Sequence, residues 1–93
     1  MRTINRTTRF KKDYKREAKG RHRASLDADL LATVAFLADN TPLPERFQDH
    51  PLTGEWIDHR DCHIKPDLVL IYRLPNAESI ELVRLGSHSE LSL

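Results

Sequence analysis

The side chains best suited to acid–base chemistry in this chain are three histidines at the edges of predicted segments. His50 and His63 stand in the window from residue 50 to residue 72, which also holds several carboxylates, an arginine and a tryptophan. His88 follows the next apolar run. Imidazole is the side chain whose unperturbed pKa, about 6.5, lies within reach of neutral pH. These residues could therefore exchange protons with a substrate if the fold brings them together.

A metal site is the chemical rival for the same histidines. Asp61 and His63 share one face of a predicted strand, and His59 and His63 would share one face of a helix. The alternation of this segment indicates a strand, which disfavours the helical pair. Neither paired cysteines nor an HExxH motif occurs in the sequence. We therefore predict no metal and no cofactor.

The length and the cysteine content limit the kind of protein. A chain of 93 residues suffices for one domain, so we expect a single domain over residues 1–93. The single cysteine, Cys62, cannot form an internal disulfide, so we expect a reducing, cytoplasmic location. No apolar run approaches the roughly 20 residues needed to span a bilayer, so we expect no membrane association.

Charge is divided unevenly along the chain. Residues 1–23 hold ten Lys or Arg against two acidic residues, a net charge of +8, whereas residues 24–93 carry −7. A basic block of this kind points to a polyanion or to an acidic protein partner, and charge alone does not choose between them. A solvated helix face is the plainer alternative.

Two helices are predicted in the first half of the chain, after a short strand at residues 3–6. Apolar residues recur every four positions from residue 10 to residue 18, following threonines that can cap a helix, and Gly20 can close it. A second helix opens at Ser25 and keeps apolar residues on one face until Asn40, Thr41 and Pro42 end it. The outer face of the first helix is Lys and Arg.

The pattern then changes to strands. Residues 57–64 alternate, which places Asp61 and His63 on one face. Residues 68–74 are apolar on both faces, as is typical of a central strand, and residues 80–85 form a last strand. The sequence thus predicts an α+β fold in which both helices cover one face of a small antiparallel sheet, while the other face stays open.

The order of these elements and several spaced residues resemble the YafQ-type toxins of the RelE/ParE superfamily. The shared features are the basic first helix, the segments D-H-P-L-x-G-x-W, R-D-x-H and P-D-x-x-L-I-Y, and the closing R-x-G-x-H. The resemblance covers nearly the whole chain, and its central run is the specific part. It implies a RelE-like fold and a toxin of a type II toxin–antitoxin system, which inhibits translation and growth as a ribosome-dependent endoribonuclease that cuts mRNA.

Carried over residue by residue, the resemblance implies a particular set of site residues. The active-site group is His50, His63, Asp67 and His88. Supporting or RNA-binding residues are Arg84, Arg60 and Trp56, and the basic helix adds Lys11, Lys12, Lys15 and Arg16. Two departures concern aromatics that related sequences carry just after the P-D pair and at the C-terminus. Here Leu68 and the tail Leu91–Leu93 take these places, so an aromatic that could stack on a base is missing at both.

The chemistry of RNA cleavage without a metal agrees with this set. It needs a base that takes the proton from the 2′-OH, an acid that protonates the 5′ leaving oxygen, and positive charge beside the phosphate. We assign His88 as the general acid and Arg84 as the phosphate clamp. Asp67 is our general base, with His50 or His63 as rivals for that role.

The resemblance also implies partners. These are an acidic antitoxin of the DinJ or RelB type, the 70S ribosome and mRNA, and the toxin–antitoxin complex would bind operator DNA through the antitoxin. The main alternative is a protein of the same superfamily that binds DNA gyrase and cleaves no RNA. A degenerate toxin that retains only antitoxin binding is a further one. The set of histidines argues against a pure binding module, which has no reason to gather them.

Overall fold

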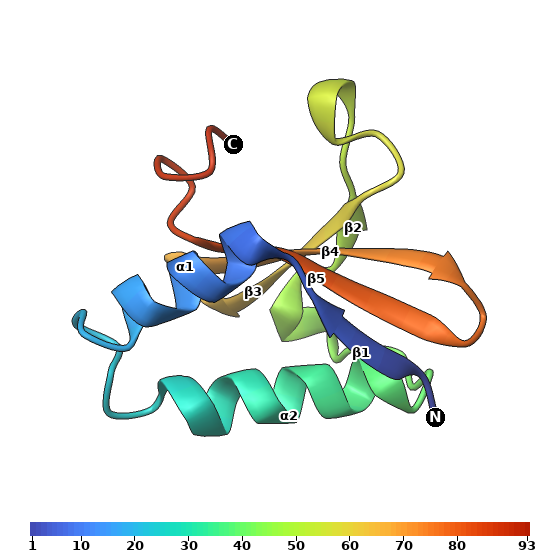
Figure 1. Cartoon of the computed structure of the whole chain (residues 1–93), viewed down its shortest axis with the longest axis horizontal. Helices are drawn as coiled ribbons and strands as arrows, with labels where there is room; N and C mark the ends of the chain where they lie inside the picture. The colour runs from blue at the N-terminus through green and yellow to red at the C-terminus, as the bar shows by residue number, and fades with distance from the viewer.

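The chain folds into two helices and a five-stranded sheet, and the computed structural model describes all residues from 1 to 93 (Figure 1). The helices are α1 (Thr8–Glu17) and α2 (Leu26–Ala38), and two short 3-10 turns are η1 (Glu45–Phe47) and η2 (Gly54–Trp56). The strands are β1 (Thr3–Arg6), β2 (His50–Pro51), β3 (Arg60–Lys65), β4 (Leu68–Asn76) and β5 (Ser79–Gly86). Their order across the sheet is β1-β5-β4-β3-β2.

The α+β class is confirmed, but the prediction of an antiparallel sheet is wrong, because the sheet is mixed. β3, β4 and β5 form the expected antiparallel meander. β1 joins it parallel to β5, from Thr3 opposite Ser79 to Arg6 opposite Leu82. A parallel pair needs a long connection, and here the two helices and the rest of the sheet lie between its strands. The sequence pattern carried no signal for this pairing.

The main hydrophobic core lies between both helices and one face of the sheet, as predicted. Phe10 of α1 and Leu26 of α2 are buried against Leu70 of β4 and Ile80 of β5. The central position of β4 is confirmed, since residues 68 to 72 are buried without interruption. Burial of both faces of this strand explains its continuous apolar run.

The opposite face of the sheet is partly covered, contrary to the expectation that it stays open. Val69 and Ile71 form a second, smaller core there with Leu91, which is only 2% exposed. Leu52 and Trp56 pack against this cluster. In Figure 1 the C-terminal tail and the η2 loop both rise from the side of the sheet away from α2. The tail is therefore docked on the sheet by a buried leucine.

The helix ends follow local chemistry. Thr7 caps α1, because its Oγ accepts a hydrogen bond from the Phe10 N–H at 3.0 Å. α1 ends at Glu17, three residues before the predicted stop at Gly20. α2 begins directly after Ser25, as predicted, and Asn40 takes a left-handed conformation (φ 58°) just beyond its end. Neither helix is long and apolar enough to cross a membrane.

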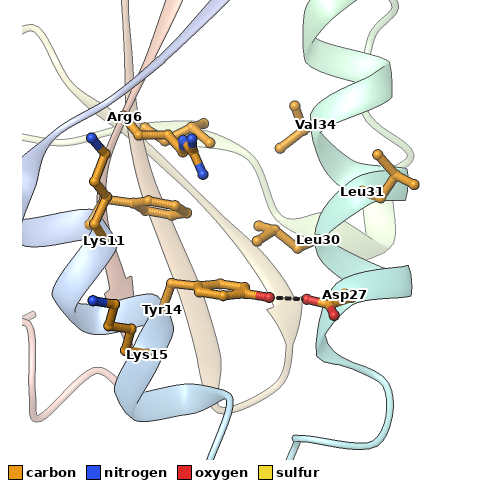
Figure 2. A pocket seen from close by; sticks show the side chains of 10 residues that line it. Arg6, Lys11, Tyr14, Lys15, Asp27, Leu30, Leu31 and Val34 are labelled. Carbon is orange, nitrogen blue, oxygen red and sulfur yellow. Dashed lines mark hydrogen bonds between the residues drawn. The ribbon is translucent and has the colours of Figure 1, made fainter.

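A groove of about 530 Å³ separates α1 from α2 and opens to solvent (Figure 2). It is bridged by a hydrogen bond from the Tyr14 hydroxyl to the Asp27 carboxylate. This bond raises the pKa of Tyr14, because it stabilises the protonated phenol beside an anion. The two helices thus share the core below without packing fully against each other.

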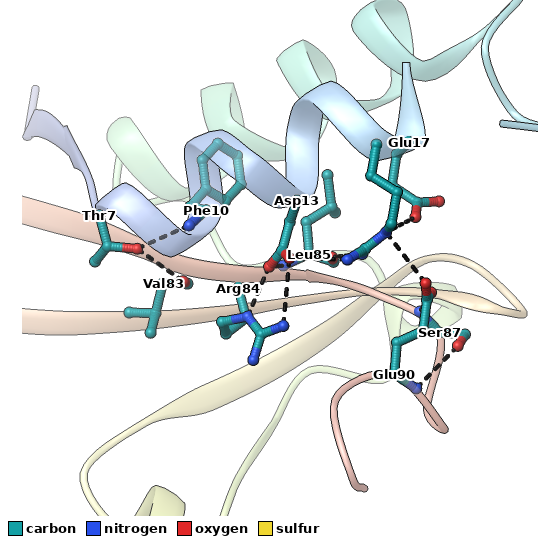
Figure 3. A network of polar contacts seen from close by, with 10 residues as sticks. Thr7, Phe10, Asp13, Glu17, Val83, Arg84, Leu85, Ser87 and Glu90 are labelled. Atoms are coloured by element: carbon teal, nitrogen blue, oxygen red, sulfur yellow. Dashed lines mark hydrogen bonds and ion pairs between the residues drawn. The ribbon is translucent and has the colours of Figure 1, made fainter. Parts of the chain in front are cut away.

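Beyond the end of β1, backbone groups of β5 form hydrogen bonds with side chains of α1 (Figure 3). Asp13, 4% exposed, accepts hydrogen bonds from Arg84 Nε at 2.7 Å and from the Leu85 N–H at 3.0 Å. Arg16 donates to the Leu85 carbonyl at 2.7 Å. Burial alone would raise the pKa of Asp13, but the bonds from Arg84 and Leu85 and the charges of Arg84 and Arg16 outweigh it and hold that pKa below its usual value.

We expect Asp13→Asn to lower the free energy of unfolding at pH 7 by about 3 kcal/mol, because it leaves Arg84 buried without its counterion. The folded-state pKa of Asp13 lies below the unfolded value of 3.8. The carboxylate therefore stabilises the fold fully above that value, and its contribution is lost as pH falls from 3.8 toward the folded pKa. Urea unfolding at pH 7 and at pH 3 should show a large difference from wild type at the higher pH and a smaller one at the lower. Asp39→Asn, at an exposed position, is the control; equal effects of the two variants would contradict the assignment.

Candidate active site

Three of the four predicted catalytic residues meet on the sheet face away from α2. His63 projects from β3, and His50 on β2 lies opposite Asp61 of β3. The rings of His63 and His88 are in edge contact, with centroids 5.0 Å apart and planes at 70°. His50 Nδ1 lies 3.0 Å from Asp61 Oδ1. The fold thus gathers three imidazoles from three separate segments around one carboxylate.

Asp61 is the residue that the sequence reading did not place in the site. It is 2% exposed, and its Oδ1 has no hydrogen-bond donor, although His50 Nδ1 is within 3.0 Å. The two observations agree because Nδ1 has one proton and directs it at the Gln48 carbonyl, 2.8 Å away. Burial raises the pKa of Asp61, and the charges of His50, His63 and His88 oppose that rise. The sequence did contain a sign of this position, because the alternation of residues 57–64 puts Asp61 on the same strand face as His63.

His63 is suited to accept a proton at neutral pH. Burial lowers its pKa below the usual 6.5, and the charge of His88 lowers it further, while Asp61 opposes both. The charge of His50 is the smallest contribution and also lowers this pKa. His63 is therefore mostly neutral at pH 7, with a ring nitrogen free to act as a base.

A cavity of about 490 Å³ opens over part of this cluster. His50, Asp61 and His88 line it together with Trp56 and Leu93. The indole of Trp56 is half-buried and packs both on the second core and against the ring of His59, with centroids 5.4 Å apart. Trp56 thus combines a structural contact with a position on the cavity wall. It offers an aromatic surface beside the imidazoles.

The turn that carries His88 is held by a capping box. Glu90 N–H donates to Ser87 Oγ at 3.2 Å, and Ser87 N–H donates to Glu90 Oε1 at 2.9 Å. Glu90 also pairs with Arg16 of α1 at 3.1 Å (Figure 3). These contacts pass over Gly86, where an added Cβ would lie 2.8 Å from the Arg16 guanidinium. A glycine at this position lets α1 and the tail approach closely.

Asp67, the predicted general base, and Arg84, the predicted phosphate clamp, both lie away from the three imidazoles. Asp67 is in the expected turn between β3 and β4, but its carboxylate is 3.0 Å from His22 Nε2 and contacts Arg21. Both partners belong to the loop between the helices. Arg84, with a side chain 12% exposed, is bound by Asp13. Neither residue contacts the three imidazoles, so the structure does not bring these two into the cluster.

The remaining predicted contacts are mostly structural. Arg60, expected to support the site or bind RNA, binds Asp49 at 3.3 Å, and Asp49 also accepts a hydrogen bond from Tyr72 at 2.5 Å. Tyr72 belongs to the main core, so this group lies on the helix side of the sheet.

The four basic residues predicted on α1 divide into two groups. Arg16 is occupied by Asp13, Glu17 and Glu90. Lys11, Lys12 and Lys15 are exposed and form no ion pair, and an RNA-binding role for them stays a prediction.

Comparison with known proteins gives one consistent result. The family model described as "Bacterial toxin of type II toxin-antitoxin system, YafQ" matches residues 2–93. The mRNA interferase toxin YafQ of Escherichia coli K12 is 38% identical over 92 residues, which cover 98% of this chain and 96% of the relative.

Solved structures agree with this match over nearly full lengths. The toxin chain matched in the E. coli DinJ-YafQ toxin–antitoxin complex has a TM-score of 0.81 and 35% identity, with 97% of this chain and 96% of that chain covered. A metal-bound toxin from Helicobacter pylori has a TM-score of 0.80 and 41% identity, with 98% and 99% covered. Although three histidines lie near Asp61, no group of three His, Cys, Asp or Glu side chains in the present chain is arranged to hold one metal ion.

We expect Asp61→Asn to lower the pKa of His63 further, because it removes the one nearby charge that favours the imidazolium. The shift can be measured by NMR titration of the ring protons below pH 6.5. Asp58→Asn, an exposed aspartate in the preceding loop, should leave the titration unchanged. A His63 pKa that rises or stays constant in Asp61→Asn would show that Asp61 does not act on this imidazole.

Proposed function

Because the chain belongs to the YafQ family of bacterial type II toxins, we propose that it cuts ribosome-bound mRNA by acid–base catalysis with His50, His63 and His88. The chain is the toxin of a toxin–antitoxin system and an mRNA interferase, which is an endoribonuclease. One observation supports the proposed mechanism above the others: three imidazoles surround a buried carboxylate beside an open cavity.

We assign the general base to His63 and the general acid to His88. The neutral His63 takes the proton from the ribose 2′-OH. The resulting oxygen attacks the adjacent phosphorus, and the bond to the 5′ oxygen breaks as His88 gives that oxygen a proton. The products are a 2′,3′-cyclic phosphate and a free 5′-hydroxyl. The edge contact of the two rings supports this pairing, because it keeps the acid and the base within reach of the same phosphodiester.

His50 binds the phosphate in this proposal, with Asp61 as its positioning partner. Its Nδ1–H donates to the Gln48 carbonyl and lies against Asp61, so the protonated ring can donate its Nε2–H to a phosphate oxygen. Arg84 is already neutralised by Asp13, so an imidazole takes the phosphate contact first expected of Arg84. Asp67, bound by the loop between the helices, supports the site without acting as the base. Trp56 offers its ring to a neighbouring base.

The ribosome and the antitoxin complete the proposed function. The cluster holds no unpaired Lys or Arg, so the chain depends on the ribosome to hold its mRNA in place. An acidic antitoxin neutralises the toxin, as DinJ assembles with the E. coli relative. The toxin–antitoxin complex binds operator DNA through the antitoxin, and action on translating ribosomes places the toxin in the cytoplasm. The gyrase-binding alternative has no support in the structure, and the relative's interferase activity favours the nuclease.

Cleavage should require the ribosome. We expect the purified chain to produce discrete cuts, mapped by primer extension, in an mRNA that is bound to 70S ribosomes. The same mRNA without ribosomes should stay intact, because the small basic surface of the chain cannot align an unstructured RNA. Equal cleavage of free and ribosome-bound mRNA would reject ribosome dependence. Intact mRNA together with inhibited gyrase would reject the nuclease mechanism.

The two candidates for the general base can be separated by mutation and pH. His63→Ala should lower the single-turnover rate on ribosomes by about 10²- to 10⁴-fold, and Asp67→Asn by less than about tenfold. The wild-type rate should fall as pH drops through the lowered pKa of His63, below 6.5, because protonation removes the base. His59→Ala is the matched histidine control. If Asp67 is the base instead, Asp67→Asn will show the larger loss.

A further inference from the structure

A further cavity, of about 500 Å³, opens beside His63 at the edge of β3. We call it the β3-edge cavity, and its polar lining is Arg46, Gln48, His63 and Lys65. The cavity over the rest of the imidazole cluster is lined by His50 and His88 but not by His63. The proposed general base and general acid therefore line different cavities, although their rings are in contact.

An irregularity in β3 gives the β3-edge cavity its shape. The ladder between β3 and β4 passes over Ile64, which makes a β-bulge between His63 and Lys65. In a regular strand these two side chains would share a face. Here Lys65 pairs with Asp29 of α2 at 2.8 Å, while His63 stays with the imidazoles. β2 pairs with only the first two residues of β3, and η1 contacts β3 beyond them. A ligand can therefore reach His63 from this edge of the sheet.

Arg46 is the cation of the β3-edge cavity that forms no ion pair. It is exposed, and its guanidinium carbon lies 4.9 Å from the centroid of the buried Phe47 ring. Contact with an aromatic ring restrains a guanidinium and leaves its N–H groups free to donate. Lys65 is already neutralised by Asp29, and no carboxylate lines the cavity. The β3-edge cavity thus suits an anion that accepts hydrogen bonds, as a phosphodiester does.

The roles of acid and base give the RNA a direction across the site. A general base takes the proton from the 2′-OH of the nucleotide on the 5′ side of the cleaved bond, here called the upstream nucleotide. The general acid protonates the 5′ oxygen of the downstream nucleotide. The β3-edge cavity, beside His63, therefore lies on the upstream side. The cavity that His88 and Trp56 line lies on the downstream side.

We propose that the β3-edge cavity binds the upstream nucleotide of the mRNA and that Arg46 donates hydrogen bonds to the phosphate on its 5′ side. The inference rests on the proposed function, because the roles of His63 and His88 set the direction of the strand. Arg46 stands outside the imidazole cluster and adds a single phosphate contact. The ribosome is still needed to hold the rest of the mRNA in place.

Gln48 contributes the neutral polar group of this nucleotide site. Its backbone is left-handed, with φ 49°, which is uncommon for a residue other than glycine. Its carbonyl accepts the hydrogen bond from His50 Nδ1–H at 2.8 Å, and its side chain lines the β3-edge cavity. A primary amide carries both donors and an acceptor, as pairing with the edge of a base requires. Gln48 thus contacts the base of the upstream nucleotide.

The phosphate contact can be tested with the full-length chain on 70S ribosomes that hold an mRNA with one mapped cleavage site. In a modified mRNA, a neutral methylphosphonate replaces the phosphate on the 5′ side of the upstream nucleotide. This change should lower the wild-type single-turnover rate about tenfold, because Arg46 loses a charged acceptor. Arg46→Ala should cut the natural mRNA about tenfold more slowly than wild type and should lose nothing further on the modified one.

Two controls accompany this experiment. Arg73→Ala removes an arginine that pairs with Glu81 near the β4–β5 hairpin, and it should cut both mRNAs like wild type. A methylphosphonate two linkages downstream of the cleaved bond should change the rates of wild type and Arg46→Ala by the same factor.

The outcomes separate this site from the proposed mechanism. If His63→Ala and His88→Ala impair cleavage but Arg46→Ala cuts at the wild-type rate, the mechanism stands and the nucleotide site is refuted. If Arg46→Ala is slow but keeps its sensitivity to the upstream methylphosphonate, Arg46 contacts another group and the inference is overturned. Insensitivity to a downstream methylphosphonate instead would mean the opposite strand direction, which also overturns it. Cleavage that needs neither His63 nor His88 would overturn both proposals.

The base contact has a test of its own. Gln48→Gly keeps the backbone carbonyl that holds His50, suits the left-handed conformation and removes only the amide side chain. Sequencing of the cut ends over a whole transcript should show that the preference among upstream bases falls by about fivefold. An unchanged preference would show that Gln48 does not contact the base.

Discussion

The buried carboxylate of Asp13 ties the helical layer to the strand that leads into the active site. β1 is four residues long and pairs with only the first part of β5, so the rest of that edge needs other partners. Asp13 and Arg16 supply them through the N–H and the carbonyl of Leu85, and Asp13 neutralises Arg84 at the same time. Arg16 then reaches Glu90 in the turn that carries His88. The position of the His88 imidazole thus depends on a polar contact between α1 and β5.

The sequence predicted the local secondary structure, but it did not predict the contacts between residues far apart in the chain. The two helices, the central strand and the strand face shared by Asp61 and His63 all follow from periodicity, which reports the local backbone and the burial of one face. The parallel pairing of β1 with β5 joins residues separated by nearly the whole chain, and no local pattern encodes it. The same limit explains the site. The resemblance identified His50, His63 and His88. It did not indicate the ion pair between Asp13 and Arg84, because that pair depends on tertiary contacts alone.

The two faces of the sheet have separate tasks in this account. One face carries the helices, the main core and an apolar groove with a basic rim. The other carries the imidazoles, the cavity and the docked C-terminal turn. The C-terminal tail has no aromatic residue. Leu91 instead anchors the turn in the second core, and Trp56 is the aromatic ring on the cavity wall.

The chemical identity of the cleaved ends tests the central claim most directly. Acid–base catalysis by His63 and His88 proceeds through the 2′-oxygen, so the upstream fragment of a ribosome-bound mRNA should end in a 2′,3′-cyclic phosphate and the downstream fragment in a 5′-hydroxyl. Mass spectrometry of the fragments, with 5′-end labelling before and after phosphatase treatment, identifies both ends. A 3′-hydroxyl upstream and a 5′-phosphate downstream would mean that water attacks the phosphorus, and the imidazole mechanism would be contradicted.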